Sequence, residues 1–182
     1  AKVFFRRVVS LIFEPILSGM NHSDGSAGLL LGWREWVSLP ELGLVLIKAK
    51  VDTGARTSTL HAFYVEAFRR GGVLHARFGV HPLQNRDDVV IHGEAPVIDQ
   101  RQVTDSGGHR EERYIILTRL VLAGHDWPIE LTLTNRETMR FRMLLGRTAL
   151  AGRAQVDPAR SFLTGRVTRP AARYAAQNVR PE

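Results

Sequence analysis

The sequence predicts an all-β protein that folds as a small closed or partly closed β-barrel. Many short apolar runs are separated by turn-forming residues at regular spacing, a pattern typical of barrels. No stretch has the length and periodicity of a long amphipathic helix, and no internal repeat is evident. One short helix is expected directly after Gly146, where an apolar strand enters a turn.

Composition places the chain among ordinary globular proteins. Its 182 residues are enough for one domain with a sizeable core, and 44% are hydrophobic and 24% charged. The absence of cysteine excludes disulfides and thiolate metal sites, which fits a cytoplasmic protein. The formal net charge of +7 indicates an acidic partner: nucleic acid, an acidic peptide or a nucleoprotein particle.

Three segments are expected along the chain. Residues 1–31 form an N-terminal extension and linker, whose apolar core is too short for a bilayer and is interrupted by Glu14 and Pro15. We therefore expect neither a signal peptide nor a membrane partner. Residues 32–165 form the barrel domain. Residues 166–182, rich in Arg, Ala and Pro, are expected to form a loosely held basic tail.

Within the domain, turn residues divide the apolar runs into expected strands. The first two are 33–39 and 44–51. Residues 59–68 and 73–80 are predicted to pair as a hairpin around two glycines. After a loop at 81–88, the predicted elements are short strands at 89–91 and 95–98, a turn or mobile loop at 104–112, a hairpin of strands 114–122 and 127–134, and a last strand, turn and short helix within 139–150.

One carboxylate stands where the second expected strand enters a turn, in the run Val51-Asp52-Thr53-Gly54-Ala55-Arg56-Thr57-Ser58. Gly54 lets the backbone turn sharply. The hydroxyls of Thr53, Thr57 and Ser58 could hold the Asp52 carboxylate in one orientation. Asp, Thr and Gly are also ordinary turn residues, so the run alone favours a surface turn over a catalytic site.

A second run, Met143-Leu144-Leu145-Gly146-Arg147, changes that balance. An apolar Asp-Thr-Gly-Ala followed by an apolar Gly-Arg resembles the two signature motifs of retropepsin-like aspartic peptidases. The resemblance extends to one bacterial family, known as RimK-associated or ATP-dependent zinc proteases. It covers roughly residues 32–165 and is carried also by three further runs, Gly32-Trp33-Arg34-Glu35-Trp36-Val37, Thr104-Asp105-Ser106-Gly107-Gly108-His109 and Ile129-Glu130-Leu131-Thr132-Leu133-Thr134-Asn135-Arg136.

The resemblance implies a retropepsin-like barrel in which the Asp-Thr-Gly loop lies beside the Gly-Arg turn. It also implies an aspartic peptidase, with Asp52, Thr53 and Gly54 as catalytic residues, that acts beside RimK, a ligase that adds glutamates to a ribosomal protein. The family name claims zinc and ATP, but the chain has no phosphate-binding Gly-x-x-x-x-Gly-Lys motif and no His-Glu-x-x-His. We therefore expect no cofactor, with His109 and Glu111 as a weak zinc signal.

Aspartic-peptidase chemistry needs two carboxylates that share one proton. The chain has one Asp-Thr-Gly that follows an apolar strand. Asp105-Ser106-Gly107 could be taken for a second catalytic loop, but it lies in a polar loop with no apolar strand before it. The economical solution is a homodimer in which each chain contributes Asp52.

Arg56 departs from the retropepsin pattern, which has an acidic residue at this place. Arg56 would repel Arg147 unless a carboxylate lies between them, supplied by Glu111, Asp105 or an acidic substrate; alternatively, Arg56 is simply solvated. Arginines beside a catalytic acid would favour glutamate-rich peptides, so Ala55, Arg56, Thr57, Ser58, His109, Glu111 and Arg147 are the expected substrate-binding residues.

Loop 104–112 is either a flap that grips substrate or an ordinary flexible hairpin, since its paired glycines allow mobility. Trp33, Trp36 and Trp127 are expected to be core or interface anchors.

Three hypotheses for function remain. The first is an aspartic peptidase acting on acidic peptides. The second is a zinc-dependent hydrolase. The third is a non-catalytic module that docks on ribosomes or another acidic partner through its arginines, with nucleic acid only incidental.

Overall fold

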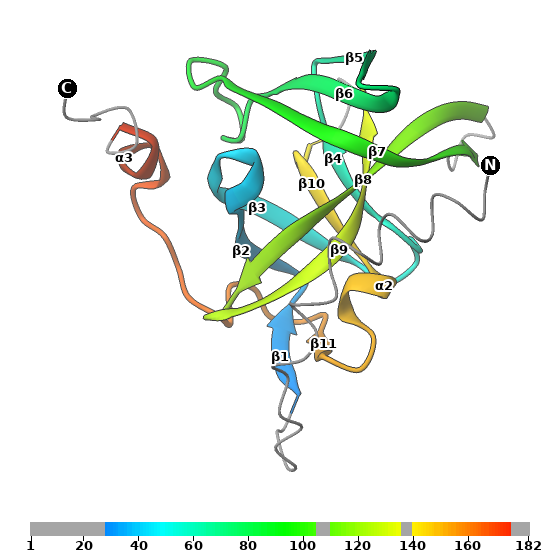
Figure 1. Ribbon diagram of the computed structural model, residues 1–182. Helices are drawn as coiled ribbons and strands as arrows, with labels where there is room; N and C mark the ends of the chain where they lie inside the picture. The colour runs from blue at the N-terminus through cyan, green and yellow to red at the C-terminus, as the bar shows by residue number, and fades with distance from the viewer. Residues whose placement is uncertain (1–27, 105–109, 136–139, 176–182) are drawn as a thin grey trace.

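The computed structural model describes residues 28–104, 110–135 and 140–175, and Figure 1 shows a β-barrel at its centre. Pairing of Ser38 with Val121 joins β2 to β8 and closes the sheet on itself, as the sequence predicted. The strands of this ring, in spatial order, are β2 (Arg34–Leu39), β3 (Leu44–Asp52), β10 (Met143–Gly146), β4 (Ser58–His61), β9 (His125–Thr134) and β8 (Arg110–Leu122).

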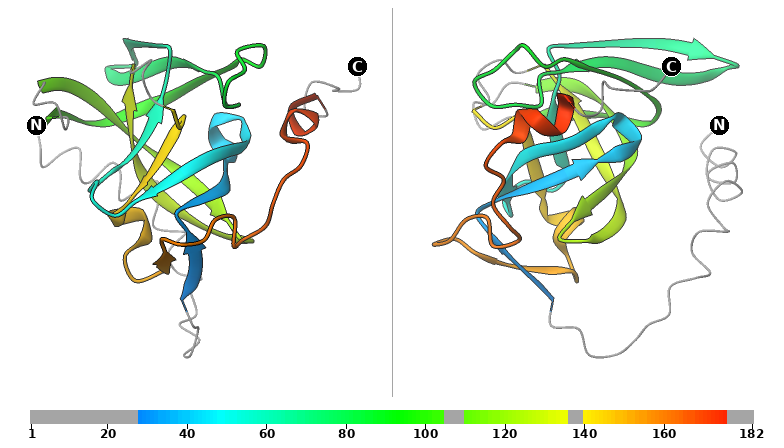
Figure 2. Two further views of the ribbon diagram at one scale, coloured as in Figure 1. Left: turned by 180° about the vertical axis from the view of Figure 1, so that it is seen from behind. Right: turned by 90° about the vertical axis from the view of Figure 1, so that its left-hand side faces the viewer.

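Further strands continue the sheet beyond β8. These are β7 (Ile91–Thr104), β6 (Val73–Val80) and β5 (Tyr64–Arg70), and the hairpin of β5 and β6 projects from the barrel in the right-hand view of Figure 2. A separate parallel pair joins β1 (Leu29–Gly32) to β11 (Ala154–Asp157). The helices are short: η1 (Pro40–Leu42), α2 (Arg147–Leu150) and α3 (Pro170–Ala175). No helix in the described segments is long and apolar enough to cross a membrane.

Strand β3 shows how the barrel separates core from surface. Successive side chains of a strand point to opposite faces. Ile47, Ala49 and Val51 are therefore buried in the core, whereas Lys48, Lys50 and Asp52 lie on the outward face and keep solvent contact. The catalytic candidate thus stands in line with two lysines on one side of a single strand.

Several predicted strand boundaries were wrong. Residues 59–68 are divided at Ala62 and Phe63, so β4 enters the barrel between β10 and β9, and β5 alone pairs with β6. The short strands expected at 89–91 and 95–98 are replaced by the single long strand β7. Arg110, assigned to a loop, begins β8 and pairs with Thr104. Pairing with neighbouring strands overrides the local turn signals at these places.

The segment from residue 166 onward is more ordered than a loose tail. Residues 170–175 form α3, and Tyr174 is 2% exposed. Its hydroxyl donates to the carbonyl of Leu46 and accepts a hydrogen bond from the Leu46 amide. This bond covers backbone groups of β3 near a β-bulge in its pairing with β2. Tyr174 therefore anchors α3 on β3, while residues 176–182 lie outside the described residues.

Glu35 fastens another part of the C-terminal region. Its side chain is fully buried, and Oε1 accepts from the amides of Gly32 (2.7 Å) and Leu163 (2.8 Å). Oε2 accepts from the amide and hydroxyl of Thr164. A buried carboxylate is stable only when its oxygens are so satisfied. Glu35 thereby joins the start of the barrel to the segment that ends it.

Candidate active site

The run from Asp52 to Ser58, here called the Asp52 loop, connects β3 to β4. Strand β10 lies between these two strands, parallel to β3 and antiparallel to β4. Gly146, the last residue of β10, pairs with Asp52, the last residue of β3. The loop must therefore cross the end of β10 to reach β4. The two motifs that the sequence separates by about ninety residues are adjacent in the structure, as the resemblance implied.

The Asp52 carboxylate is held by backbone amides. Oδ1 accepts hydrogen bonds from the N–H groups of Gly54 and Ala55, both at 3.1 Å. No donor in the described part of the chain contacts Oδ2. The loop is thus a small cradle that fixes one carboxylate oxygen and leaves the other open, while Thr53 and Gly54 are exposed to solvent.

The hydroxyls expected to orient the Asp52 carboxylate do not bond to it. Ser58 is buried, and its Oγ accepts a hydrogen bond from the amide of Gly146 at 3.1 Å. Thr53 is exposed and Thr57 is half-buried, and neither hydroxyl bonds to Asp52. The expectation that side-chain hydroxyls hold Asp52 was wrong, because the tight turn at Gly54 brings backbone N–H groups close enough.

Gly146 is required by the crossing of the loop over β10. A Cβ atom at this position would lie 2.5 Å from the carbonyl carbon of Thr57 and 2.8 Å from the carbonyl oxygen of Arg56. Both are backbone atoms and cannot rotate away. Since φ of Gly146 is −77°, the requirement is steric, not conformational.

The two arginines of the motifs differ in their roles. The Arg147 side chain reaches back and donates to the carbonyls of Gly54 (3.2 Å) and Thr53 (3.4 Å). The Arg147 amide bonds to the Ala55 carbonyl, so side chain and backbone both support the loop. The Arg56 side chain is exposed, and its carbonyl accepts from the amide and hydroxyl of Thr148.

No carboxylate separates Arg56 from Arg147 among the described residues, so the predicted bridging acid is absent from this part of the chain. Glu111 instead bonds to Arg113 (2.9 Å) and to the Thr134 hydroxyl (3.4 Å). Thr134 pairs with the end of β4, about 10 Å along that strand from Ser58. Glu111 is therefore not brought to the Asp52 loop. His109 and Asp105 lie outside the described residues.

Zinc was a weak expectation. Within residues 28–104, 110–135 and 140–175, no three His, Asp or Glu side chains gather closely enough to hold a metal ion. The described residues thus do not fit a zinc site.

Trp127 and Trp33 behave as packing residues. Trp127 is buried, and its Nε1 donates to the carbonyl of Ala149 at 2.9 Å, which fastens α2 beneath the Gly-Arg turn. Trp33 packs edge-on against Phe141. Sequence reasoning missed Thr148 and the bonding roles of Ser58 and Glu35. Ser58 and Glu35 lie within the motif runs and Thr148 directly follows one, and this position was their only signal.

Comparison with known proteins agrees with this geometry. Residues 30–167 match the family described as "Retropepsin-like aspartic endopeptidase RimB". A "Probable alpha-L-glutamate ligase" of Parasynechococcus marenigrum (strain WH8102) is 53% identical over 137 residues, which are 75% of this chain and 29% of that protein. A protein of the same name from Shewanella halifaxensis (strain HAW-EB4) is 46% identical over 136 residues, 75% of this chain and 30% of that protein.

Among solved structures, a Legionella pneumophila protein of unknown function, Lpg0085, superposes with a TM-score of 0.63 at 27% identity. The superposition covers 75% of this chain and 98% of that chain. This chain spans less than a third of the length of the glutamate-ligase relatives named above. By its motifs, its barrel and its match over residues 30–167, the chain belongs to the RimB-like family of retropepsin-like aspartic endopeptidases.

Proposed function

We propose that this chain is an aspartic peptidase that hydrolyses acidic, glutamate-rich peptide bonds, with Asp52 as its catalytic carboxylate. The observation that carries the proposal is the Asp52 cradle. Two backbone N–H groups fix Oδ1, Gly146 lets the loop cross β10 closely, and no donor among the described residues contacts Oδ2. A carboxylate held in one orientation suits general acid–base work on a water molecule.

Two chains are needed for this chemistry. In an aspartic dyad one carboxylate takes a proton from the attacking water, while the other, protonated, donates to the scissile carbonyl. The described residues place no second carboxylate beside Asp52. A two-fold axis through the exposed Thr53–Gly54 turn would bring Asp52 of two copies together, so we propose a homodimer as the active form.

The proposed substrate class follows from charge. Arg56 is exposed beside the cradle without a carboxylate partner among the described residues, and the chain carries a net charge of +7. Acidic side chains near the scissile bond would complement these cations. The relatives named as probable alpha-L-glutamate ligases support a link to glutamate addition, with a RimK-type ligase and its ribosomal protein as proposed partners.

The test is cleavage of a peptide that ends in five glutamates, followed by mass spectrometry. Asp52→Asn should abolish cleavage, because the amide cannot act as a general base. The matched control is Asp87→Asn, which removes an exposed carboxylate paired with Arg142 and should leave cleavage unchanged. Full activity of Asp52→Asn would refute the proposal.

A second candidate is a non-catalytic module that binds an acidic partner. The observation that favours it is the single Asp-Thr-Gly in the chain, which is half of a dyad. This candidate predicts salt-sensitive binding of the glutamate peptide by a monomer, with no cleavage by either wild type or Asp52→Asn.

A further inference from the structure

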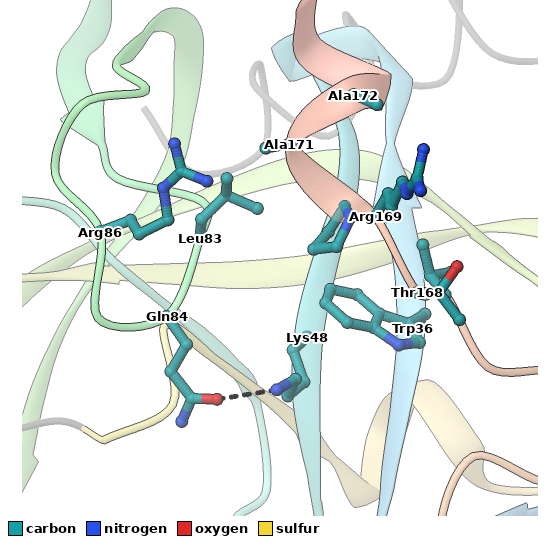
Figure 3. Close-up of a pocket in the computed structure, with 11 residues that line it drawn as sticks. Trp36, Lys48, Leu83, Gln84, Arg86, Thr168, Arg169, Ala171 and Ala172 are labelled. Carbon is teal, nitrogen blue, oxygen red and sulfur yellow. Dashed lines mark hydrogen bonds between the residues drawn. The ribbon is translucent and has the colours of Figure 1, made fainter.

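A second site lies on the outward face of β3, four residues before Asp52. A pocket of about 590 Å³ opens between strands β2 and β3, the loop that joins β6 to β7, and the segment that leads into α3 (Figure 3). We call it the basic pocket. Its main polar and aromatic lining residues are Trp36, Lys48, Gln84, Arg86 and Arg169.

The charge of the basic pocket is positive on several sides. Lys48 comes from β3, Arg86 from the β6–β7 loop and Arg169 from the segment before α3. No Asp or Glu is among the described residues that line it. Arg86 is paired with exposed Asp88, but in the described part of the chain neither Lys48 nor Arg169 has a carboxylate partner.

Lys48 is positioned as a donor. Its Nζ donates to Oε1 of Gln84 at 3.0 Å, and Nε2 of Gln84 donates in turn to the carbonyl of Arg140. An ammonium group has three N–H donors, and this contact uses one. Burial, and next the positive charge of Arg34, lower the pKa of Lys48 below its ordinary value. An anion bound at Nζ would offset the repulsion between Lys48 and Arg34.

The Trp36 ring forms one wall of the basic pocket, and further aromatic rings pack behind it. Trp36 stacks on Phe162 with ring centroids 6.1 Å apart, and Lys48 Nζ lies 5.2 Å from the Trp36 ring. Arg34 lies between Trp33 and Phe162, and its buried Nε has no hydrogen-bond partner among the described residues. Trp36 and Leu83 line the pocket and offer apolar contact to the methylene groups of a bound acidic side chain.

We infer that the basic pocket binds the carboxylate side chains of an acidic peptide, and that it is an anchoring subsite for the substrate of the Asp52 site. The identity of the bound peptide rests on the proposed peptidase function. The location of the subsite rests on the charge and the lining residues of the pocket. Lys48, Lys50 and Asp52 share one face of β3. Lys48 and Asp52 are therefore about 13 Å apart, a span of four extended residues.

A peptide fits this arrangement better than a nucleotide does. Phosphate groups are typically held by adjacent backbone N–H groups of a glycine-rich loop or helix start. Here the cations belong to three separate elements, and no glycine-rich loop is among the described residues that line the pocket. The start of α3 does line it, but α3 has only 6 residues and begins at Pro170, which has no backbone N–H to donate. Spaced cations match carboxylates that recur along a chain.

The test measures binding of fluorescein-labelled pentaglutamate by fluorescence anisotropy, with Asp52→Asn as the parent protein so that the peptide stays intact. Lys48→Met and Arg169→Met should each weaken binding about tenfold, since each removes a charge-assisted contact. Arg169 is exposed, so its variant does not disturb the core. The matched control is Arg77→Met on β6, an equal change of charge outside the pocket, which should stay within about twofold.

The inference is overturned if both pocket variants bind as the parent does, or if Arg77→Met loses as much affinity. It is also overturned if pentaglutamine binds as tightly, or if ATP or inorganic phosphate displaces the probe at lower concentration than unlabelled pentaglutamate does.

This test and that of the peptidase fail separately. Lys48-dependent binding without cleavage by wild type would remove the peptidase and retain the pocket. Cleavage with a KM that Lys48→Met does not change would retain the peptidase and remove the pocket.

Discussion

Replacing Gly146 with alanine tests whether contact between β10 and the Asp52 loop sets the site. The new Cβ would lie 2.5 Å from the Thr57 carbonyl carbon, whereas carbon atoms in contact prefer about 3.5 Å or more. The loop backbone must therefore move by about 1 Å. Overpacking of this kind costs about 2 kcal/mol of unfolding free energy, or roughly 4–8 °C in Tm.

The same shift should reach the carboxylate. Gly54 and Ala55, whose amides hold Oδ1 of Asp52, belong to the loop that moves. A displacement of about 1 Å from productive geometry can lower a reaction rate about 100-fold. We expect Gly146→Ala to shift the Gly54 and Ala55 amide resonances and to lower cleavage of the glutamate peptide by about that factor.

The measurements are urea unfolding, amide spectra and cleavage rate, with Gly124→Ala as control. Gly124 lies in the β8–β9 turn with φ of +79°, and a Cβ added there would meet no atom within 4 Å. Its alanine variant should lose about 1–2 kcal/mol through strain and keep both the amide spectrum and the activity. Unchanged Gly54 and Ala55 resonances and a wild-type midpoint in Gly146→Ala would refute the reasoning.

Two further predictions concern the fastening of the C-terminal region. Burial raises the pKa of Tyr174 to about 12 from 10.0, so its stabilisation is present below pH 10 and is lost as the pH rises through 12. Tyr174→Phe should therefore lower the unfolding free energy by about 1 kcal/mol at pH 8. In urea unfolding, the variant should also lose less unfolding free energy than wild type between pH 8 and 11.5. An equal loss in both proteins would contradict this prediction. Glu35→Ala leaves the donors of Gly32, Leu163 and Thr164 unpaired and should lower the unfolding free energy by about 3–5 kcal/mol. Glu35→Gln should have a stability between those of wild type and Glu35→Ala. A calorimetric Tm of Glu35→Ala equal to that of wild type would contradict this prediction.

Strand content was predictable because local pattern and tertiary burial agree there. Alternation along β3 places Ile47, Ala49 and Val51 inside, and the turn at 123–124 has the glycine that a tight hairpin needs. The predicted strand boundaries were wrong where strands distant in the sequence compete to pair with the same segment. Ala62 donates to the Thr134 carbonyl of β9, whereas Phe63 donates to the Gly79 carbonyl of β6, so the chain changes its partner strand within one mostly apolar run. Residues 170–175 were predicted to belong to a loosely held tail, because nothing in the neighbouring sequence indicates that Tyr174 is buried against Leu46.

The sequence by itself determined the class of protein and the position of its one candidate acid, since Asp52-Thr53-Gly54 and Leu145-Gly146-Arg147 are local motifs after apolar strands. Only the tertiary structure decided what holds that acid. Backbone amides of Gly54 and Ala55, not hydroxyls, bind Asp52, and Arg147 supports the loop through its carbonyls. It also decided that Lys48 and Asp52 share a face with a basic pocket. These contacts join residues far apart in the chain, and hydrogen bonds depend on distance and direction, which composition and spacing do not specify.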